Sequence, residues 1–216
     1  MKKTLQRVFG QGIFGTGWKN AIYCLILAVG VYFASQIYGL LNHGPAVINL
    51  HTPLDSAIPV IPIFVIPYVS LQPYIYATLV LFLLFRTKYF QSVCLAMITV
   101  WLISYGFYYF LQSEVIRPVL TGADTFSKMV MNVYAGDNAF NDFPSLHTSL
   151  STILAIHWVR VNKSIGIVLS IWTALIVAAT LFIKQHYIAD MIFGLALAFA
   201  LSWLYLKVIV KQPAAN

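Results

Sequence analysis

Long apolar stretches, separated by polar connections, make up most of this chain. A helix needs about 20 apolar residues to cross the hydrocarbon core of a bilayer. Six segments approach or reach that length, and they are Ala21–Leu41, Tyr68–Phe85, Phe90–Gln112, Ser145–Val159, Ile165–Ile183 and Tyr187–Val210. The fourth is short and contains serine and threonine, so hydropathy supports it least. The pattern predicts an all-α, polytopic membrane protein built as a six-transmembrane-helix bundle.

Two of the polar connections are long. Residues 43–67 contain five prolines, and a proline inside a helix removes a backbone hydrogen bond and clashes with the preceding turn. We therefore expect 43–67 to be a proline-rich re-entrant or interfacial segment that lies against the bundle. Residues 113–144 are polar and acidic, which predicts a loop outside the membrane. No internal repeat or low-complexity tract is present, so we expect a single helical domain.

Composition supports the membrane interpretation and excludes other classes of protein. Only 9% of the 216 residues are charged, against about 25% in soluble domains, and the mean hydropathy is +0.82. A disordered chain and a disulfide scaffold are excluded, and Cys24 and Cys94 are expected to be small buried hydrophobes. The sequence pI of about 9.4 does not indicate nucleic-acid binding, because the basic residues are scattered between apolar blocks.

The positions of the charged residues predict which side of the membrane each loop faces. With six spans, both termini share a side with the connections at 86–89 and 160–163, and this side holds ten of the 13 Lys and Arg residues. Cytoplasmic loops are enriched in Lys and Arg, so the termini are expected in the cytoplasm. All six acidic residues fall on the other side or at its membrane boundary. The functional face is therefore expected to be extracytoplasmic.

Three polar clusters lie on that face, and ionisable residues near the membrane are candidates for function. The cluster before the last span contains His186 and Asp190, which share a helix face because they are four residues apart. Asp190 could fix the tautomer of the imidazole and leave the other nitrogen as a base or nucleophile. Two alternatives remain open: a metal pair, with His147 as a further ligand, and a capped helix start with an interfacial histidine.

Another polar cluster, residues 142–149, lies at the start of the fourth predicted span. The remaining cluster, residues 114–118, comes directly after the third predicted span. Pro144 suits the first position of a helix, Asp142 could cap it, and the free N–H groups would form an anion site beside Ser145. His147 is close enough to protonate a leaving group. Arg117 adds a planar bidentate donor suited to phosphate. The alternatives are simple helix capping by Asp142 and Ser145, and an interfacial anchor for the arginine.

Together these clusters resemble a known family. Arg117-Pro118, Pro144-Ser145-Leu146-His147 and His186-x-x-x-Asp190 are similar, in order and spacing, to the three signature motifs of the type 2 phosphatidic acid phosphatase superfamily. The resemblance implies that His186 is a nucleophile forming a phosphohistidine, oriented by Asp190. It also implies that His147 is the general acid, that Arg117 and Ser145 bind phosphate oxygens, and that neither a metal nor another cofactor takes part.

The chain departs from the superfamily pattern at several positions. Phe110 stands at the usual lysine of the first motif, and Ala179 and Thr180 stand at the usual Ser-Arg of the third. Two phosphate-binding cations are therefore missing, and Lys184 is a candidate replacement. The altered third motif and the segment 54–68 resemble the branch that contains inositol phosphorylceramide synthases. In that reading Asp55, together with Asp142 and Gln185, would support the site or bind an acceptor.

We therefore expect an integral membrane lipid phosphatase that cleaves a lipid phosphate ester at the extracytoplasmic face. The alternatives are a phospholipid headgroup phosphotransferase and a non-enzymatic lipid-binding protein. The expected partner is a membrane lipid substrate, with neither nucleic acid nor an obligate protein partner. Residues 1–20 would form a basic cytoplasmic N-terminus, 21–210 the transmembrane catalytic domain and 211–216 a cytoplasmic tail.

Overall fold

The computed structural model describes residues 11–211 of the chain. The basic residues Lys2, Lys3 and Arg7, which entered the orientation argument, and most of the expected C-terminal tail lie outside the described residues. Within residues 11–211 the regular structure is helical, apart from two isolated bridges that join Ile48 to Ser113 and Glu114 to Phe140. The all-helical prediction is confirmed.

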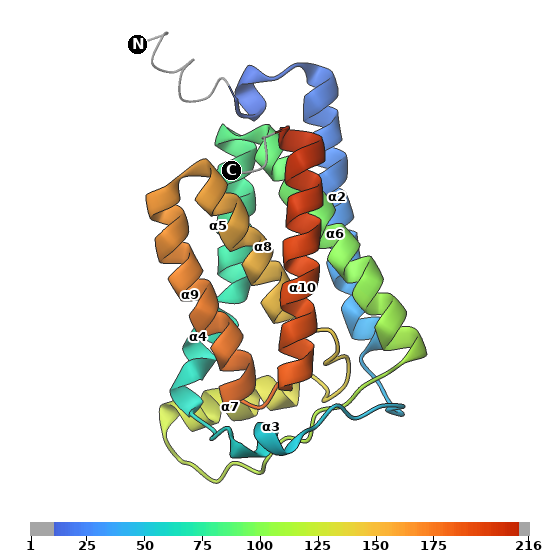
Figure 1. The fold of residues 1–216 in the computed structure, drawn as a ribbon, viewed down its shortest axis with the longest axis vertical. Helices are drawn as coiled ribbons and strands as arrows, with labels where there is room; N and C mark the ends of the chain where they lie inside the picture. The colour runs from blue at the N-terminus through green and yellow to red at the C-terminus, as the bar shows by residue number, and fades with distance from the viewer. Residues whose placement is uncertain (1–10, 212–216) are drawn as a thin grey trace.

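Six long helices form an elongated bundle (Figure 1). They are α2 (Trp18–Leu41), α5 (Leu71–Phe85), α6 (Thr87–Phe110), α8 (Leu146–Val161), α9 (Lys163–Phe182) and α10 (Ile188–Tyr205). A π-helical turn, η3 (Leu206–Val210), continues α10.

Five stretches of the described chain are long and apolar enough to cross a membrane. They are Trp18–Leu41, Pro62–Phe85, Thr87–Phe110, Lys163–Phe182 and Ile188–Val210. The sixth predicted span corresponds to α8, which has 16 residues and is shorter than the other five. A multi-span membrane protein is supported, while the sixth span stays a prediction.

The short elements mostly gather at one end of the bundle. A 3-10 turn, η1 (Ile13–Gly15), precedes α2, and the others are α3 (Pro53–Ala57), η2 (Pro62–Phe64), α4 (Val65–Val69) and α7 (Thr125–Gly136). Figure 1 shows α3 and α7 lying across the end of the bundle at which α8 and α10 begin. This end carries all three polar clusters.

The proline-rich segment is divided differently from our expectation. Pro62 starts η2, and the 3-10 turn, α4 and α5 together form the candidate span Pro62–Phe85. A proline in the first turn of a helix costs no hydrogen bond, because the N–H at that position has no partner in the helix. Residues 62–67 are therefore helical and continue into a candidate span, while the re-entrant or interfacial character of 43–67 stays a prediction.

The predicted loop at 113–144 contains the helix α7, which we did not expect. The carboxylate of Asp124 accepts hydrogen bonds from the backbone N–H groups of Phe126 and Ser127, 3.0 Å each, and so caps its start. Val130, fully buried, packs this helix against α4 and the end of α9. The signal in the sequence was an N-cap residue followed by apolar residues three and four apart, which is easily missed in a short polar stretch.

The α8 helix is the centre of the bundle, since it packs against α5, α6, α9 and α10. The buried hydroxyl of Ser149 finds partners inside the protein, since its Oγ donates to the backbone oxygens of Ser145 (2.8 Å) and Gly194 (3.2 Å). A Cβ at Gly194 would lie 2.9 Å from the backbone oxygen of Ser145. The glycine therefore lets the start of α10 approach the start of α8, which brings Asp190 beside Ser145.

Candidate active site

Three connections that are far apart in the sequence meet at one cavity of about 550 Å³. They are the segment after α6, the segment before α8 and the turn between α9 and α10. The polar end of the cavity is lined by Arg117, Asp137, Asp142, His147, Gln185 and His186. The structure thus brings together both predicted histidines and the predicted arginine.

The imidazole of His186 is held by hydrogen bonding at one nitrogen. Nδ1 lies 2.8 Å from the backbone oxygen of Asp142. A carbonyl oxygen can only accept a hydrogen bond, so Nδ1 carries a proton, and in the neutral form of the ring the lone pair is on Nε2. This is the tautomer that a nucleophilic Nε2 requires.

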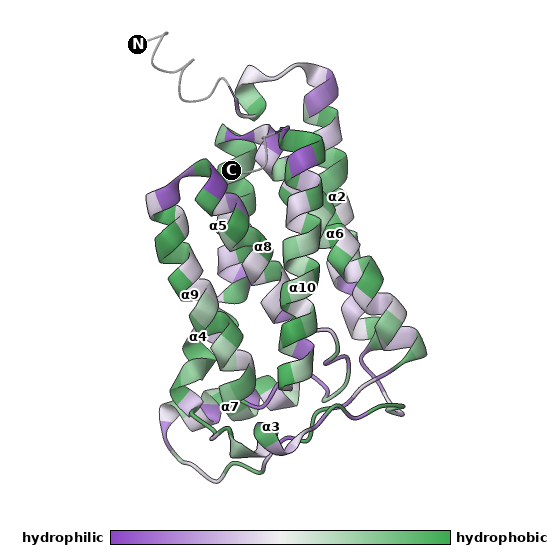
Figure 2. Ribbon diagram, in the orientation of Figure 1, coloured by the Kyte–Doolittle hydropathy of each residue, from purple (hydrophilic) through white to green (hydrophobic). Residues whose placement is uncertain are grey.

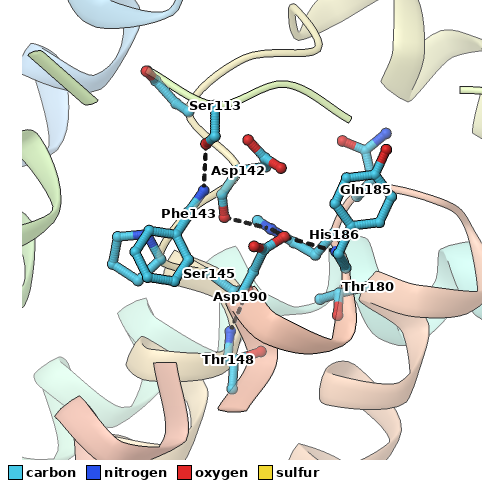
Figure 3. Close-up of polar contacts among 12 residues, drawn as sticks. Ser113, Asp142, Phe143, Ser145, Thr148, Thr180, Gln185, His186 and Asp190 are labelled. Atoms are coloured by element: carbon cyan, nitrogen blue, oxygen red, sulfur yellow. Dashed lines mark hydrogen bonds and ion pairs between the residues drawn. The ribbon is translucent and has the colours of Figure 1, made fainter. Parts of the chain in front are cut away.

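Asp190 lies next to this histidine but does not hold it by a direct hydrogen bond. Its Oδ2 is 3.6 Å from Nδ1 of His186 and accepts a hydrogen bond of 2.7 Å from the backbone N–H of Tyr187. Figure 3 shows the imidazole between the Asp142 carbonyl and the Asp190 carboxylate. The Asp142 carbonyl is thus the direct hydrogen-bond partner of the ring, and the fully buried carboxyl group of Asp190 lies beside it.

His147 lies in the first turn of α8, and its ring stacks on that of Tyr68. The ring centroids of these two residues are 4.0 Å apart with an interplanar angle of 14°. The centroid of the His147 ring is 6.3 Å from that of His186, so one phosphate ester can reach both imidazoles. Sequence reasoning did not assign a role to Tyr68, because only the fold shows that α4 reaches α8 at this point.

Arg117 is positioned by α7. Its Nη1 donates to the backbone oxygens of Tyr134 (3.3 Å) and Asp137 (2.6 Å), and Nη2 donates to Asn138 O (3.0 Å) and Gln185 Oε1 (2.8 Å). Carbonyls at a helix C-terminus carry partial negative charge and favour a cation there. The arginine therefore closes the end of α7 while lining the cavity.

Ser145 is placed as a helix cap. Its Oγ accepts a hydrogen bond of 3.3 Å from the backbone N–H of Thr148, its side chain is completely buried, and it does not line the cavity. This position supports the capping interpretation and not a direct contact with phosphate. Asp142, which we considered as a second cap, does not cap α8.

Asp142 instead lines the cavity as a residue, while its carboxylate oxygens are buried. The side chain is 2% exposed, and neither carboxylate oxygen has a hydrogen-bond partner among the described residues. Burial, and then the nearby Asp190, raises the pKa of Asp142 to about 6. The nearby hydroxyl of Ser113 and the ring of His186 oppose this rise.

Lys184 and Asp55 do not line the cavity. Their hydrogen bonds join the proline-rich segment at α3 to the connection between α9 and α10. Lys184 Nζ donates to the backbone oxygens of Asp55 (2.8 Å) and Ile58 (2.6 Å) at the end of α3. Burial lowers the pKa of this ammonium group. The replacement of a missing phosphate-binding cation by Lys184 is thus not supported by its position.

The carboxylate of Asp55 is used in the same junction. Its Oδ1 accepts from the backbone N–H of Ile188 (2.8 Å), and its Oδ2 accepts from the backbone N–H and hydroxyl of Thr52 (2.8 and 2.6 Å). Asp55 therefore ties the proline-rich segment to the start of α10, which corresponds to the supporting role that we considered and not to acceptor binding.

Two further polar groups face the site. Gln185 Oε1 accepts from Arg117 and, at 3.4 Å, from the hydroxyl of Tyr68. Asp137 accepts from the hydroxyl of Tyr38 (3.1 and 3.2 Å) and lines the cavity. Burial raises the pKa of Asp137, and Arg117 opposes the rise. From the sequence, Asp137 was recognised only as one of the six acidic residues on the predicted functional face. It belongs to none of the three motifs, so no role was assigned to it.

Beyond its polar end the same cavity continues between α2 and α5 as an apolar groove. The lining there includes Ala28, Val31, Leu71, Ile75 and Leu79. A hydrocarbon chain is the kind of ligand that such walls favour. Within residues 11–211 no three His, Cys, Asp or Glu side chains are arranged to hold a metal ion, so a metal pair at His186 and Asp190 lacks its further ligands in this arrangement.

Comparison with protein families gives one match: residues 108–214 fit the model of the PAP2 superfamily. The matched range begins near the end of α6 and contains Arg117, Asp142, His147, His186 and Asp190. Comparison with curated proteins and with solved structures gives no match.

Proposed function

Since the chain belongs to the PAP2 superfamily, whose members are phosphatases and phosphotransferases, we propose that it is a membrane lipid phosphatase acting through a phosphohistidine. The observation that carries the proposal is the cavity: His186, His147 and Arg117 line its polar end, and an apolar groove continues from it. A lipid phosphate ester has the same two parts, an anionic head and a hydrocarbon chain.

In the first step the phosphate group lies against Arg117 and His186 Nε2 attacks phosphorus. A nitrogen–phosphorus bond forms, and the bond between phosphorus and the lipid oxygen breaks. His147 donates a proton to the departing oxygen, so the lipid leaves as an alcohol. The Asp142 carbonyl and the Asp190 carboxylate stabilise the positive charge that develops on the His186 ring.

In the second step water attacks the phosphorus atom of the phosphohistidine. His147, now neutral, accepts a proton from this water, and the nitrogen–phosphorus bond breaks with the electron pair returning to Nε2. Inorganic phosphate leaves, and both histidines return to their starting protonation states. No metal ion is needed for this sequence, because Arg117 and the histidines supply the charge.

The proposal is tested with the full-length protein purified in detergent. Phosphatidic acid should release inorganic phosphate without any added alcohol, and His186→Ala should abolish the release. A brief reaction with radiolabelled substrate should leave an acid-labile, base-stable phosphate on the protein, which is the behaviour of a phosphohistidine. Phosphate release by His186→Ala at the rate of the unaltered protein would overturn the proposal.

One observation favours a second candidate, a phospholipid headgroup phosphotransferase. Asp137 and Asp142 place two acidic residues at the polar end of the cavity, and a carboxylate is suited to accept a hydrogen bond from an alcohol. An alcohol held there would take the place of water in the second step. Release of phosphate only when it is transferred to an added alcohol, with no hydrolysis, would favour this candidate.

We also propose that the cavity opens toward the extracytoplasmic side. The six acidic residues gather at its end of the bundle, while the connections at the other end are basic.

A further inference from the structure

A second cavity is lined by residues of α8, α9, α10 and η3, and Figure 1 shows α8 behind α9 and α10. Its volume is about 1180 Å³, above the range of roughly 300–1,000 Å³ that is usual for small-molecule pockets. It is separate from the candidate active site, since the two cavities share no lining residue. Nothing in the proposed chemistry uses it.

The walls of this cavity are suited to a hydrocarbon chain. Small residues of α8 and α9, including Ala155, Ala174 and Ala178, leave the space open, and Phe199 and Trp203 of α10 form one edge and are each 60% exposed. Along α10 the lining runs from Met191 to Lys207, about 24 Å at the rise of a helix. The groove is therefore long enough for an extended acyl chain.

One end of the groove is positively charged. Arg160, Lys163 and Lys207 belong to the lining and are exposed. Lys207 Nζ lies 4.9 Å from the centre of the Trp203 ring. These three residues come from the end of α8, the start of α9 and the turn that follows α10, and the fold brings them to the same end of the bundle.

Within residues 11–211 no acidic side chain lies near these three cations. All six acidic residues of the chain lie in or next to the connections at the opposite end, where the candidate active site is located. Figure 2 shows the hydrophilic positions of the α8–α9 turn and of the end of α10, with hydrophobic bands along the helices between the two ends. An apolar groove with an unbalanced cationic end is complementary to a lipid with a net negative head.

We propose that the groove between α9 and α10 is a binding site for an anionic phospholipid of the surrounding bilayer. The phosphate of the lipid contacts Arg160, Lys163 and Lys207, and its acyl chains lie along the apolar walls. Basic pockets between transmembrane helices hold anionic headgroups in this way. A zwitterionic lipid fits the walls equally well but gains less from the three cations. The proposal does not depend on the proposed enzymatic function.

The test is native mass spectrometry of the full-length protein in detergent, with dioleoyl phosphatidylglycerol and dioleoyl phosphatidylcholine offered in equal amounts. The unaltered protein should retain phosphatidylglycerol in preference by about tenfold, and Arg160→Gln/Lys163→Gln/Lys207→Gln should lose most of this preference. The matched control is Lys19→Gln/Lys88→Gln/Lys211→Gln, which removes the same charge at residues that do not line the groove. It should keep the preference.

Two further variants distinguish the groove from other sites on the protein. Ala178→Trp keeps all three cations but fills the groove, so it should lose bound phosphatidylglycerol. Arg117→Gln/His186→Ala alters the candidate active site, and its phosphatidylglycerol binding should be unchanged. Circular dichroism and the melting temperature are used to check that each variant is folded. If Arg160→Gln/Lys163→Gln/Lys207→Gln does not fold, the single variants Lys163→Gln and Lys207→Gln are measured instead.

Several results would overturn the proposal. One is equal retention of phosphatidylglycerol and phosphatidylcholine by the unaltered protein. Another is an equal loss of the preference for phosphatidylglycerol in the groove triple variant and in the control triple variant, because the preference would then depend on the total charge of the protein. Loss of the lipid only in Arg117→Gln/His186→Ala would place it in the candidate active site. A dimer that disappears in Ala178→Trp without added lipid would identify a second copy of the chain as the occupant.

Discussion

Nδ1 of His186 lies 2.8 Å from the backbone oxygen of Asp142, and this contact joins two segments that are 44 residues apart in the chain. The carbonyl performs the task that the sequence suggested for Asp190, namely fixing the tautomer. Asp190 lies slightly further away, at 3.6 Å from the same nitrogen. This division of roles leads to the first prediction.

Asp190→Asn should reduce kcat by about tenfold to a hundredfold, whereas His186→Ala should remove activity. The Asp142 carbonyl still holds the ring in Asp190→Asn, so what is lost is the negative charge that stabilises the charged imidazole. Both variants are assayed with phosphatidic acid under saturating conditions. Complete loss in Asp190→Asn, with an unchanged melting temperature, would contradict this division of roles, because the carboxylate would then be as essential as His186 itself.

His147→Ala should lower kcat for an alkyl phosphate by about a hundredfold to ten thousandfold, the usual contribution of a general acid. An aryl ester with a good leaving group needs little protonation, so the same variant should retain much more of its activity with that substrate. The two substrates are compared in one preparation. Equal losses with both would contradict the general-acid role.

Asp142→Asn should change how thermal stability depends on pH. The pKa of Asp142 in the folded protein is raised to about 6, above about 3.9 for an unfolded chain. Between these values the folded state binds more protons, so this group makes the protein less stable as the pH rises from 4 to 6, by at most about 3 kcal/mol.

The amide of Asp142→Asn has no such titration. Relative to the unaltered protein, the melting temperature of this variant should therefore be higher at pH 7.5, and the difference should shrink as the pH falls to 4. Ser113→Ala is a useful comparison, because it removes the hydroxyl that opposes the rise in pKa. A difference in melting temperature that is the same at pH 4 and pH 7.5 would contradict the buried, ionisable carboxylate.

Arg117→Gln and Lys184→Gln should have different effects, although each removes one cation near the site. Arg117 lines the cavity, so its loss should raise KM for phosphatidic acid by about tenfold or more, in line with the loss of a charge-assisted contact to phosphate. The ammonium group of Lys184 donates to backbone carbonyls of α3 and its C-cap and does not line the cavity described by residues 11–211. Its loss should lower the melting temperature and leave KM within about twofold, the value expected when no substrate contact is removed. A matching rise in KM for Lys184→Gln would show that its ammonium group reaches the substrate.

The orientation in the membrane is tested with single cysteines. Val119→Cys, in the segment after α6 where the native side chain is 91% exposed, should react with an impermeant maleimide added outside intact cells. Lys163→Cys, at the other end of the bundle, should react only after the membrane is permeabilised. Cys24 and Cys94 are buried, and each variant is compared with the unaltered protein as its background. Labelling of Lys163→Cys from outside, without labelling of Val119→Cys, would reverse the orientation.

The sequence by itself determined the helical, membrane-spanning character and the family. Apolar stretches of about 20 residues can satisfy their backbone in a bilayer only as helices, so α2, α6, α9 and α10 follow from composition. The Arg117, His147 and His186 motifs were enough to identify the superfamily, because their order and spacing are local properties of the chain. The domain boundaries, the sixth span and the catalytic roles stay predictions.

Only the tertiary structure decided which groups meet at the cavity. Sequence spacing indicates that Lys184 is next to His186, but its backbone turns the side chain toward α3, with a φ of 50°. Tyr68 and the carbonyl of Asp142 reach the histidines from distant segments, and Gly194 permits the close approach of α10 to α8. The direction of a side chain depends on the backbone that carries it and on the helices packed around it. Neither is contained in the spacing of a motif.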